Sequence, residues 1–184
     1  RPQDKNREFI QTQAASLPPK IEAAQQEIEK LLLGGTSGRV TVEEVTRSVA
    51  NSARFDSFRL VDCVLAGQLG ECLRVASGLQ RTGVAIQLVY AALYRELTVA
   101  NTVRTAIGAG ENETVAFKKL RVWPARQGAM RQALRRLSAN DFGEAFRTLS
   151  LIDRQSKGRA RGDAWQTLDR LLWFICDPRR AGWP

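Results

Sequence analysis

The 184-residue sequence contains no histidine and only three cysteines. Cys63, Cys72 and Cys176 lie far apart and form no CxxC pair, so the ligand spacing of a cysteine zinc site is missing. Without histidine there is no imidazole to bind a metal or to act as the base of a Ser-His or Cys-His pair. We therefore expect no catalytic residue, no metal and no cofactor in this chain. The cysteines are expected to be buried thiols of a cytosolic protein.

Long apolar runs are also lacking. No stretch approaches about 18 consecutive apolar residues, so we expect no transmembrane helix. The first residues, Arg1-Pro2-Gln3-Asp4, contain neither an initiator methionine nor the apolar core of a signal peptide. The sequence is therefore expected to be either an internal fragment of a longer protein or a chain from which disordered parts are left out. Two helical patterns join abruptly at Leu17-Pro18-Pro19, which suggests that residues are missing there.

Acidic residues are fewer than basic ones. The 19 Asp and Glu residues face 28 Lys and Arg residues, which leaves a net charge of +9. An excess of this size favours contact with a polyanion, because bound cations displace the counterions of a nucleic acid. The alternative is a basic surface that meets only solvent.

Strand-like alternation is absent, whereas apolar residues recur at the helical spacing of 3.6. A Thr41–Glu44 capping box, glycine breaks and Pro124 mark helix ends. For the last part of the chain, Asn140-Asp141 is the predicted cap of one helix and Asp177-Pro178 the stop of another. Helices are expected at about 20–33, 42–50, 54–66, 71–82, 85–107, 115–120, 124–137, 141–152 and 163–176. Short connections between them predict an all-α fold, a helical bundle.

One basic segment is free of acidic residues. Arg131 and Arg135 are four residues apart on one helical face, where like charges repel by a few tenths of a kcal/mol. DNA phosphate or an acidic subunit surface would relieve this repulsion, and a solvated face is the alternative. The candidate contact residues here are Lys118, Lys119, Arg121, Arg126, Arg131 and Arg135, with Arg136 beside them.

A second basic cluster occupies a predicted turn. Lys157, Arg159 and Arg161 alternate with Gly158 and end at Gly162. Glycines allow backbone and cations to approach a phosphate closely. Because no aromatic ladder accompanies them, contact with the nucleic-acid backbone is more plausible than base stacking. The alternative is an exposed turn without a ligand.

Two tryptophans lie near predicted helix starts. Trp123 precedes Pro124, and Trp165 follows Asp163. A tryptophan in such a place is most often a core residue, so we expect both to be buried, with anchoring of a subunit interface as the alternative.

Several segments together resemble the delta-subunit family of bacterial DNA polymerase III clamp loaders. Their order and spacing carry the resemblance, which covers about 21–172, and RVWPARQ is the most specific piece. The segments are VTVEEVTRSVANSARF at 40–55, FDSFRLVDCVLAGQLGECLRVASGL at 55–79, LYREL at 93–97, RVWPARQ at 121–127, and IDRQSKG at 152–158 followed by Trp165.

The resemblance implies a parent with an AAA+-like domain that lacks ATPase machinery, a helical lid and a helical collar. Residues 1–50 would then be part of the lid and 54–184 the oligomerising collar. The implied partners are the gamma/tau and delta prime subunits and primer–template DNA, with the sliding clamp bound through an N-terminal domain absent from these residues. The implied place is the replisome at the nucleoid in the bacterial cytoplasm, away from membranes. A nucleotidyltransferase label would describe the polymerase holoenzyme.

Two other interpretations remain open. Another loader subunit of the gamma/tau or delta prime type would bring zinc-binding cysteines or a phosphate-binding Walker A loop, and the sequence has neither. A free-standing basic helical module would bind nucleic acid tightly as a monomer.

Overall fold

The computed structural model describes residues 56–179, and this part of the chain consists of helices joined by turns and loops, without a strand. It confirms the predicted all-α helical bundle. The helices expected at 20–33 and 42–50, and the division between lid and collar, lie outside the described residues. The elements are a helical segment at 56–66, α4 (Leu69–Arg81), α5 (Ile86–Gly108), α6 (Glu113–Lys119), α7 (Pro124–Arg136), α8 (Ala139–Ser156) and α9 (Ala164–Cys176).

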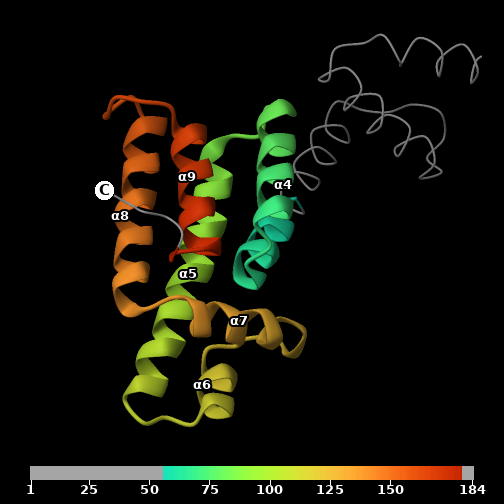
Figure 1. Cartoon of the computed structure of the whole chain (residues 1–184), viewed down its shortest axis with the longest axis vertical. Helices are drawn as coiled ribbons and strands as arrows, with labels where there is room; N and C mark the ends of the chain where they lie inside the picture. The colour runs from blue at the N-terminus through green and yellow to red at the C-terminus, as the bar shows by residue number, and fades with distance from the viewer. Residues whose placement is uncertain (1–55, 180–184) are drawn as a thin grey trace, which may run out of the picture.

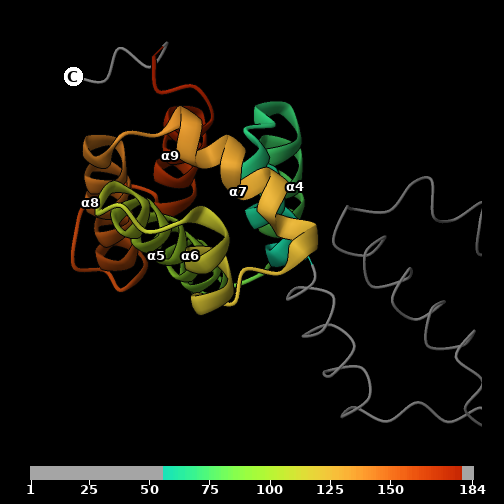
Figure 2. The same cartoon turned by 90° about the horizontal axis from the view of Figure 1, so that it is seen from below.

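Four helices form the body of the bundle. α4, α5, α8 and α9 run roughly side by side, and α7 crosses near one end of them (Figures 1 and 2). α8 packs against both α9 and α5, while α4 packs against α9. α5 has 23 residues and extends beyond the others, so that its far half contacts α6 and α7.

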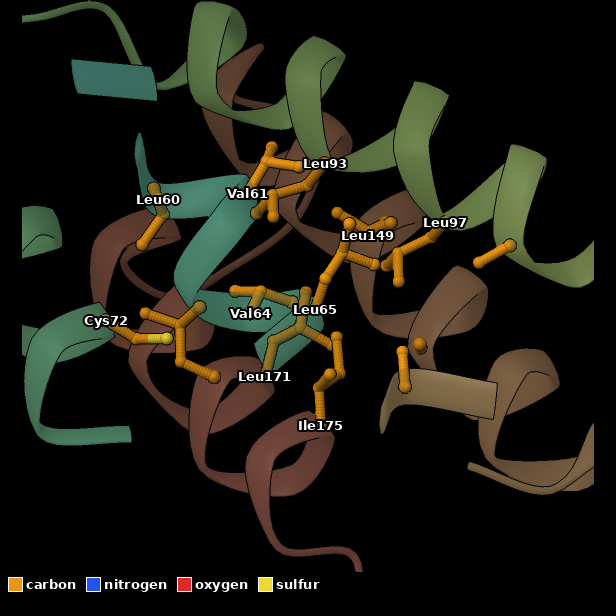
Figure 3. Packing of buried hydrophobic residues seen from close by; sticks show 14 of the residues in the cluster. Leu60, Val61, Val64, Leu65, Cys72, Leu93, Leu97, Leu149, Leu171 and Ile175 are labelled. Carbon is orange, nitrogen blue, oxygen red and sulfur yellow. The ribbon is translucent and has the colours of Figure 1, made fainter. Parts of the chain in front are cut away.

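The helical segment at 56–66 lies at the centre of the core. Its residues Leu60, Val61, Val64 and Leu65 are each at most 1% exposed. Figure 3 shows them among side chains of α5, α8 and α9, including Leu93, Leu97, Leu149, Leu171 and Ile175. Spacings of one and four residues give this segment a wide apolar face. Each fully buried Leu or Val adds about 1.5–3 kcal/mol.

The predicted helix ends are largely confirmed. Gly67 ends the 56–66 segment with a φ of 72°, and Pro124 opens α7 as expected. Asp163 caps α9 by accepting a hydrogen bond from the Gln166 backbone N–H at 2.8 Å. Asp177 follows the last turn of α9.

The predicted cap of α8 is wrong. Ser138 caps the helix instead of Asn140-Asp141, and its Oγ accepts from the Asp141 N–H at 3.2 Å. The Asp141 carboxylate accepts in turn from the Ser138 N–H at 2.6 Å. This reciprocal box satisfies two backbone donors that Asn140 alone could not, and the helix therefore begins earlier, at Ala139.

The fully buried face of α4 is narrow. Leu73 and Val75 are only half-buried, although they pack against the core. Cys72, Ala76 and Leu79 form the buried stripe. Small residues there allow close packing, and the Sγ atoms of Cys72 and Cys176 of α9 lie 3.6 Å apart.

The cysteines agree with expectation, because Cys63, Cys72 and Cys176 are buried free thiols. In the 56–179 region, no helix is long and apolar enough to cross a membrane.

Candidate nucleic-acid interface

Arg126 is one of the predicted contact residues, but it is an internal tie between three elements. Its guanidinium lies 2.7 Å from Asp62 and 3.0 Å from Glu96, which joins α7 to the 56–66 segment and to α5. Burial opposes its charge, but the hydrogen bond and charge of Asp62 and the charge of Glu96 outweigh burial and raise the pKa of Arg126. The charge of Arg126 is therefore compensated within the protein by two carboxylates.

Three more predicted cations are paired. Arg131 lies 2.5 Å from Glu113 and stacks over the Phe117 ring, with its Cζ 5.2 Å from the ring centroid. The Nζ of Lys119 is 3.5 Å from Glu111, and that of Lys157 is 2.7 Å from Asp153. The expectation of uncompensated charge is thus wrong for these residues and for Arg126. The acids that pair with these cations lie outside the two basic segments in sequence. The absence of acidic residues within a segment therefore did not indicate that its cations were unpaired.

Arg136 is a half-buried structural residue. Its Nη2 donates to the carbonyls of Val64 at 2.8 Å and Leu65 at 3.2 Å, and its Nε donates to Ile175 at 2.9 Å. These carbonyls belong to the last turns of the 56–66 segment and α9, where the helix dipole favours a cation. Burial lowers the pKa of Arg136, but a guanidinium keeps its charge in a protein.

Five predicted cations have no ion pair in the part of the chain that the structure describes. All five are exposed. Lys118 and Arg121 lie near Trp123, Arg135 stands alone on α7, and Arg159 and Arg161 lie in the turn between α8 and α9.

Trp123 contradicts the expectation of a core residue, because its side chain is 76% exposed. Arg121 adopts a left-handed backbone with a φ of 55°, and Val122 after it packs partly against the core. Trp123 then stands outward just before Pro124. It borders an apolar surface pocket of about 460 Å³ with Phe117 and Val122, beside the cations Lys118 and Arg121. Trp165, in contrast, is half-buried and packs against the core, although we expected it to be buried.

Arg161 lies at a groove of about 450 Å³ between α8 and α9. Three further arginines line this groove: Arg147 and Arg154 from α8, and Arg170 from α9. Sequence reasoning missed these three. Arg147 and Arg154 are seven residues apart and so share a helical face, which was an available signal. The approach of Arg170 follows only from the packing of α9 on α8.

The turn that carries Arg161 is held by specific contacts. Gln155 donates from its Nε2 to the Arg161 carbonyl at 3.0 Å, and the Arg159 N–H donates to the Arg154 carbonyl at 2.8 Å. Gly162 has a φ of 105°, and a Cβ at this position would lie 2.6 Å from Gln155 Nε2. Glycine is therefore required here, and the backbone of the turn is closely fixed.

The acids in the groove only partly offset its arginines. Glu144 pairs with Arg147 at 2.6 Å, and Asp163 is engaged in capping α9. Four arginines against two acids leave a formal charge of +2 in the lining. Arg154, Arg161 and Arg170 have no ion pair among the described residues.

Fold and surface together define a helical bundle whose exposed cations gather at a groove and around an exposed tryptophan. No protein-family model matches the chain. Over 154 residues, which are 84% of the chain and 45% of the relative, it is 29% identical to DNA polymerase III subunit delta of Escherichia coli strain K12. The chain therefore spans just under half the length of this curated relative. The similarity supports a relationship to the delta family.

Proposed function

We propose that this chain is the collar, with part of the lid, of a delta-type subunit of a bacterial DNA polymerase III clamp loader. The observation that carries the proposal is the similarity to the Escherichia coli delta subunit across 84% of the chain. The helical bundle at 56–179 is the architecture that such a collar requires. In this proposal residues 54–184 form the collar and 1–50 the partial lid.

The proposed role is assembly. The collar packs side by side with the collars of gamma/tau and delta prime subunits, and the assembled loader places the sliding clamp on primed DNA in the bacterial cytoplasm. Contact with the clamp belongs to a part of the parent protein outside this chain. In this proposal the partners carry out the chemistry of loading, and this chain holds its neighbouring subunits together through its collar.

The direct test is size-exclusion chromatography with light scattering on the full chain, alone and mixed with gamma/tau and delta prime. A single larger complex containing all three would support the collar assignment. A chain that elutes alone with every combination of partners would overturn it.

Within the assembled loader, we propose that the unpaired cations of the α8/α9 turn approach the DNA. The double substitution Arg159→Glu and Arg161→Glu should weaken DNA binding and lower its salt dependence, because fewer phosphates are then neutralised. Arg81 is an exposed residue at the end of α4, distant in sequence from this turn, so Arg81→Glu serves as a control for charge reversal elsewhere on the surface. An unchanged salt dependence in the double variant would remove this turn from the DNA contacts.

Trp123 is proposed as a second contact, either with a base or with a neighbouring subunit. An exposed indole beside Lys118 and Arg121 offers a stacking face with cations for the phosphate next to it. It also suits an interface anchor. Trp123→Ala should cost about 1–3 kcal/mol of DNA affinity if it stacks on a base. If it anchors a subunit, the same variant weakens assembly and leaves DNA affinity per assembled loader unchanged.

A free-standing nucleic-acid-binding module is the second candidate function, and the basic α8/α9 groove favours it. It predicts tight binding of DNA or RNA by the isolated chain as a monomer, without loader subunits. Binding that appears only in the assembled complex would exclude this candidate.

A further inference from the structure

We infer that the groove between α8 and α9 binds the phosphodiester backbone of a nucleic acid over several consecutive phosphates. The inference rests on the proposed function for its setting, because it names the surface through which the proposed collar would hold primed DNA. The groove residues that act are Arg147, Arg154, Arg161 and Arg170.

The spacing of the cations indicates an extended ligand. Arg147 and Arg154 are seven residues apart on α8, which is roughly 10 Å along the helix at a rise of about 1.5 Å per residue. Arg170 stands on the opposite wall and Arg161 at the turn that closes one end. A single phosphate would meet only part of such a row. A nucleic-acid strand carries a phosphate charge about every 3.4 Å of duplex axis and matches a row of this length.

Two hydroxyls of the groove lining are already engaged within the protein. The Thr148 hydroxyl donates to the Glu144 carbonyl at 3.0 Å, and the Thr167 hydroxyl donates to the Asp163 carbonyl at 3.0 Å. No aromatic side chain stands among the described lining residues. The groove therefore presents several cations and no stacking surface, which predicts binding that depends on charge more than on base sequence.

An acidic protein segment fits the groove less well. Protein interfaces centre on buried apolar anchors, and Leu151 is the aliphatic side chain that the described lining offers. The arginines here are exposed and lie along the rim, where they meet a solvated polyanion at low desolvation cost. The observations therefore favour a nucleic acid.

The test uses the full chain and the double neutralisation Arg154→Gln with Arg170→Gln. The matched control is Arg81→Gln with Arg179→Gln, which removes the same charge from exposed sites outside the groove. Binding of labelled oligothymidylate is followed by anisotropy over a range of salt concentrations. Unfolding temperatures of both variants verify that the bundle is intact.

The groove variant should lose about tenfold in affinity near 0.15 M salt, and the slope of log K against log salt should fall by about 1.4, or roughly 0.7 for each lost contact to a single strand. The control should keep the slope of the original chain. Equal loss in both variants, or no loss in the groove variant, would overturn the inference. The inference would also be overturned if inorganic tripolyphosphate displaced the labelled oligothymidylate as effectively as unlabelled oligothymidylate does, because that result indicates a site for one small anion.

Assembly is measured on the same variants, which separates this inference from the proposed function. If the chain joins gamma/tau and delta prime but the groove variant binds DNA normally, the groove inference fails and the collar proposal stands. If the chain joins neither partner while the groove variant loses DNA affinity, the collar proposal fails and the groove inference stands. A groove variant that loses only assembly would assign the groove to a protein partner and overturn the inference.

Discussion

Two neighbouring arginines of α7 have opposite environments. Arg136 is half-buried and donates to the carbonyls of Val64, Leu65 and Ile175, whereas Arg135 is exposed and has no ion pair in the described region. The sequence presents them as one basic pair. They differ because the side chain of Arg136 points toward the ends of the 56–66 segment and α9, whereas that of Arg135 points to solvent.

Arg136→Ala should lower the free energy of unfolding by about 2–3 kcal/mol, because it leaves buried carbonyls at two helix ends without a donor. Arg135→Ala should change it by less than about 0.5 kcal/mol, as expected for an exposed site. Urea denaturation of both variants measures the difference. Equal stabilities would mean that Arg136 does not tie these helix ends together.

The buried Cys63 thiol predicts a loss of stability at high pH. Burial raises the pKa of Cys63 above its ordinary value of 9.0, against an opposing effect of Arg59. In the unfolded chain the thiol ionises near pH 9, while in the folded chain it stays protonated. Its contribution to stability is therefore present below that pH and is lost as pH rises above it.

Cys63→Ala should remove this component, so its free energy of unfolding should fall less steeply above pH 9 than that of the original chain. Urea denaturation at several pH values measures the two slopes, and lysines and tyrosines contribute equally to both. Identical slopes would show that the thiol is not protected in the folded state.

At the scale of elements, helix positions follow closely from the sequence and caps less so. Gly67, Pro124 and Asp163 end or begin helices where expected, since each has a local effect on backbone geometry. The α8 cap was misplaced because Asn140 and Ser138 are both good capping residues. The choice depends on whether Asp141 can return a hydrogen bond, and only Ser138 stands three residues before it.

Ser138→Ala should destabilise the bundle by about 1 kcal/mol, because an Asp141 N–H at the start of α8 loses its acceptor. Asn140→Ala should be close to neutral, since Asn140 is exposed in the first turn. Thermal unfolding of the two variants compares them. A larger effect at Asn140 would restore the cap predicted from the sequence.

At the scale of the whole molecule, the apolar pattern predicts the all-α bundle, but the charge pattern only partly predicts the candidate site. Arg159 and Arg161 are exposed and lack an ion pair among the described residues, as their glycine-bounded turn indicated. Arg126 and Arg131 were expected to carry uncompensated charge, but acids distant in sequence, such as Asp62 and Glu113, come close to them on folding. Arg170 was missed for the same reason, since α9 brings it to the groove.

The whole-molecule account depends on whether the chain joins a loader. Similarity to the Escherichia coli delta subunit, the helical bundle and the basic groove each fit that role. In the proposed role, the chain joins gamma/tau and delta prime in one complex. Such a complex separates a collar subunit from a self-associating or monomeric binding protein.

The most direct measurement is native mass spectrometry of the full chain mixed with gamma/tau and delta prime. The account predicts a complex of defined mass that holds this chain together with both partners. A chain found only as a monomer or as a complex with itself, with the partners assembling without it, would contradict the central claim.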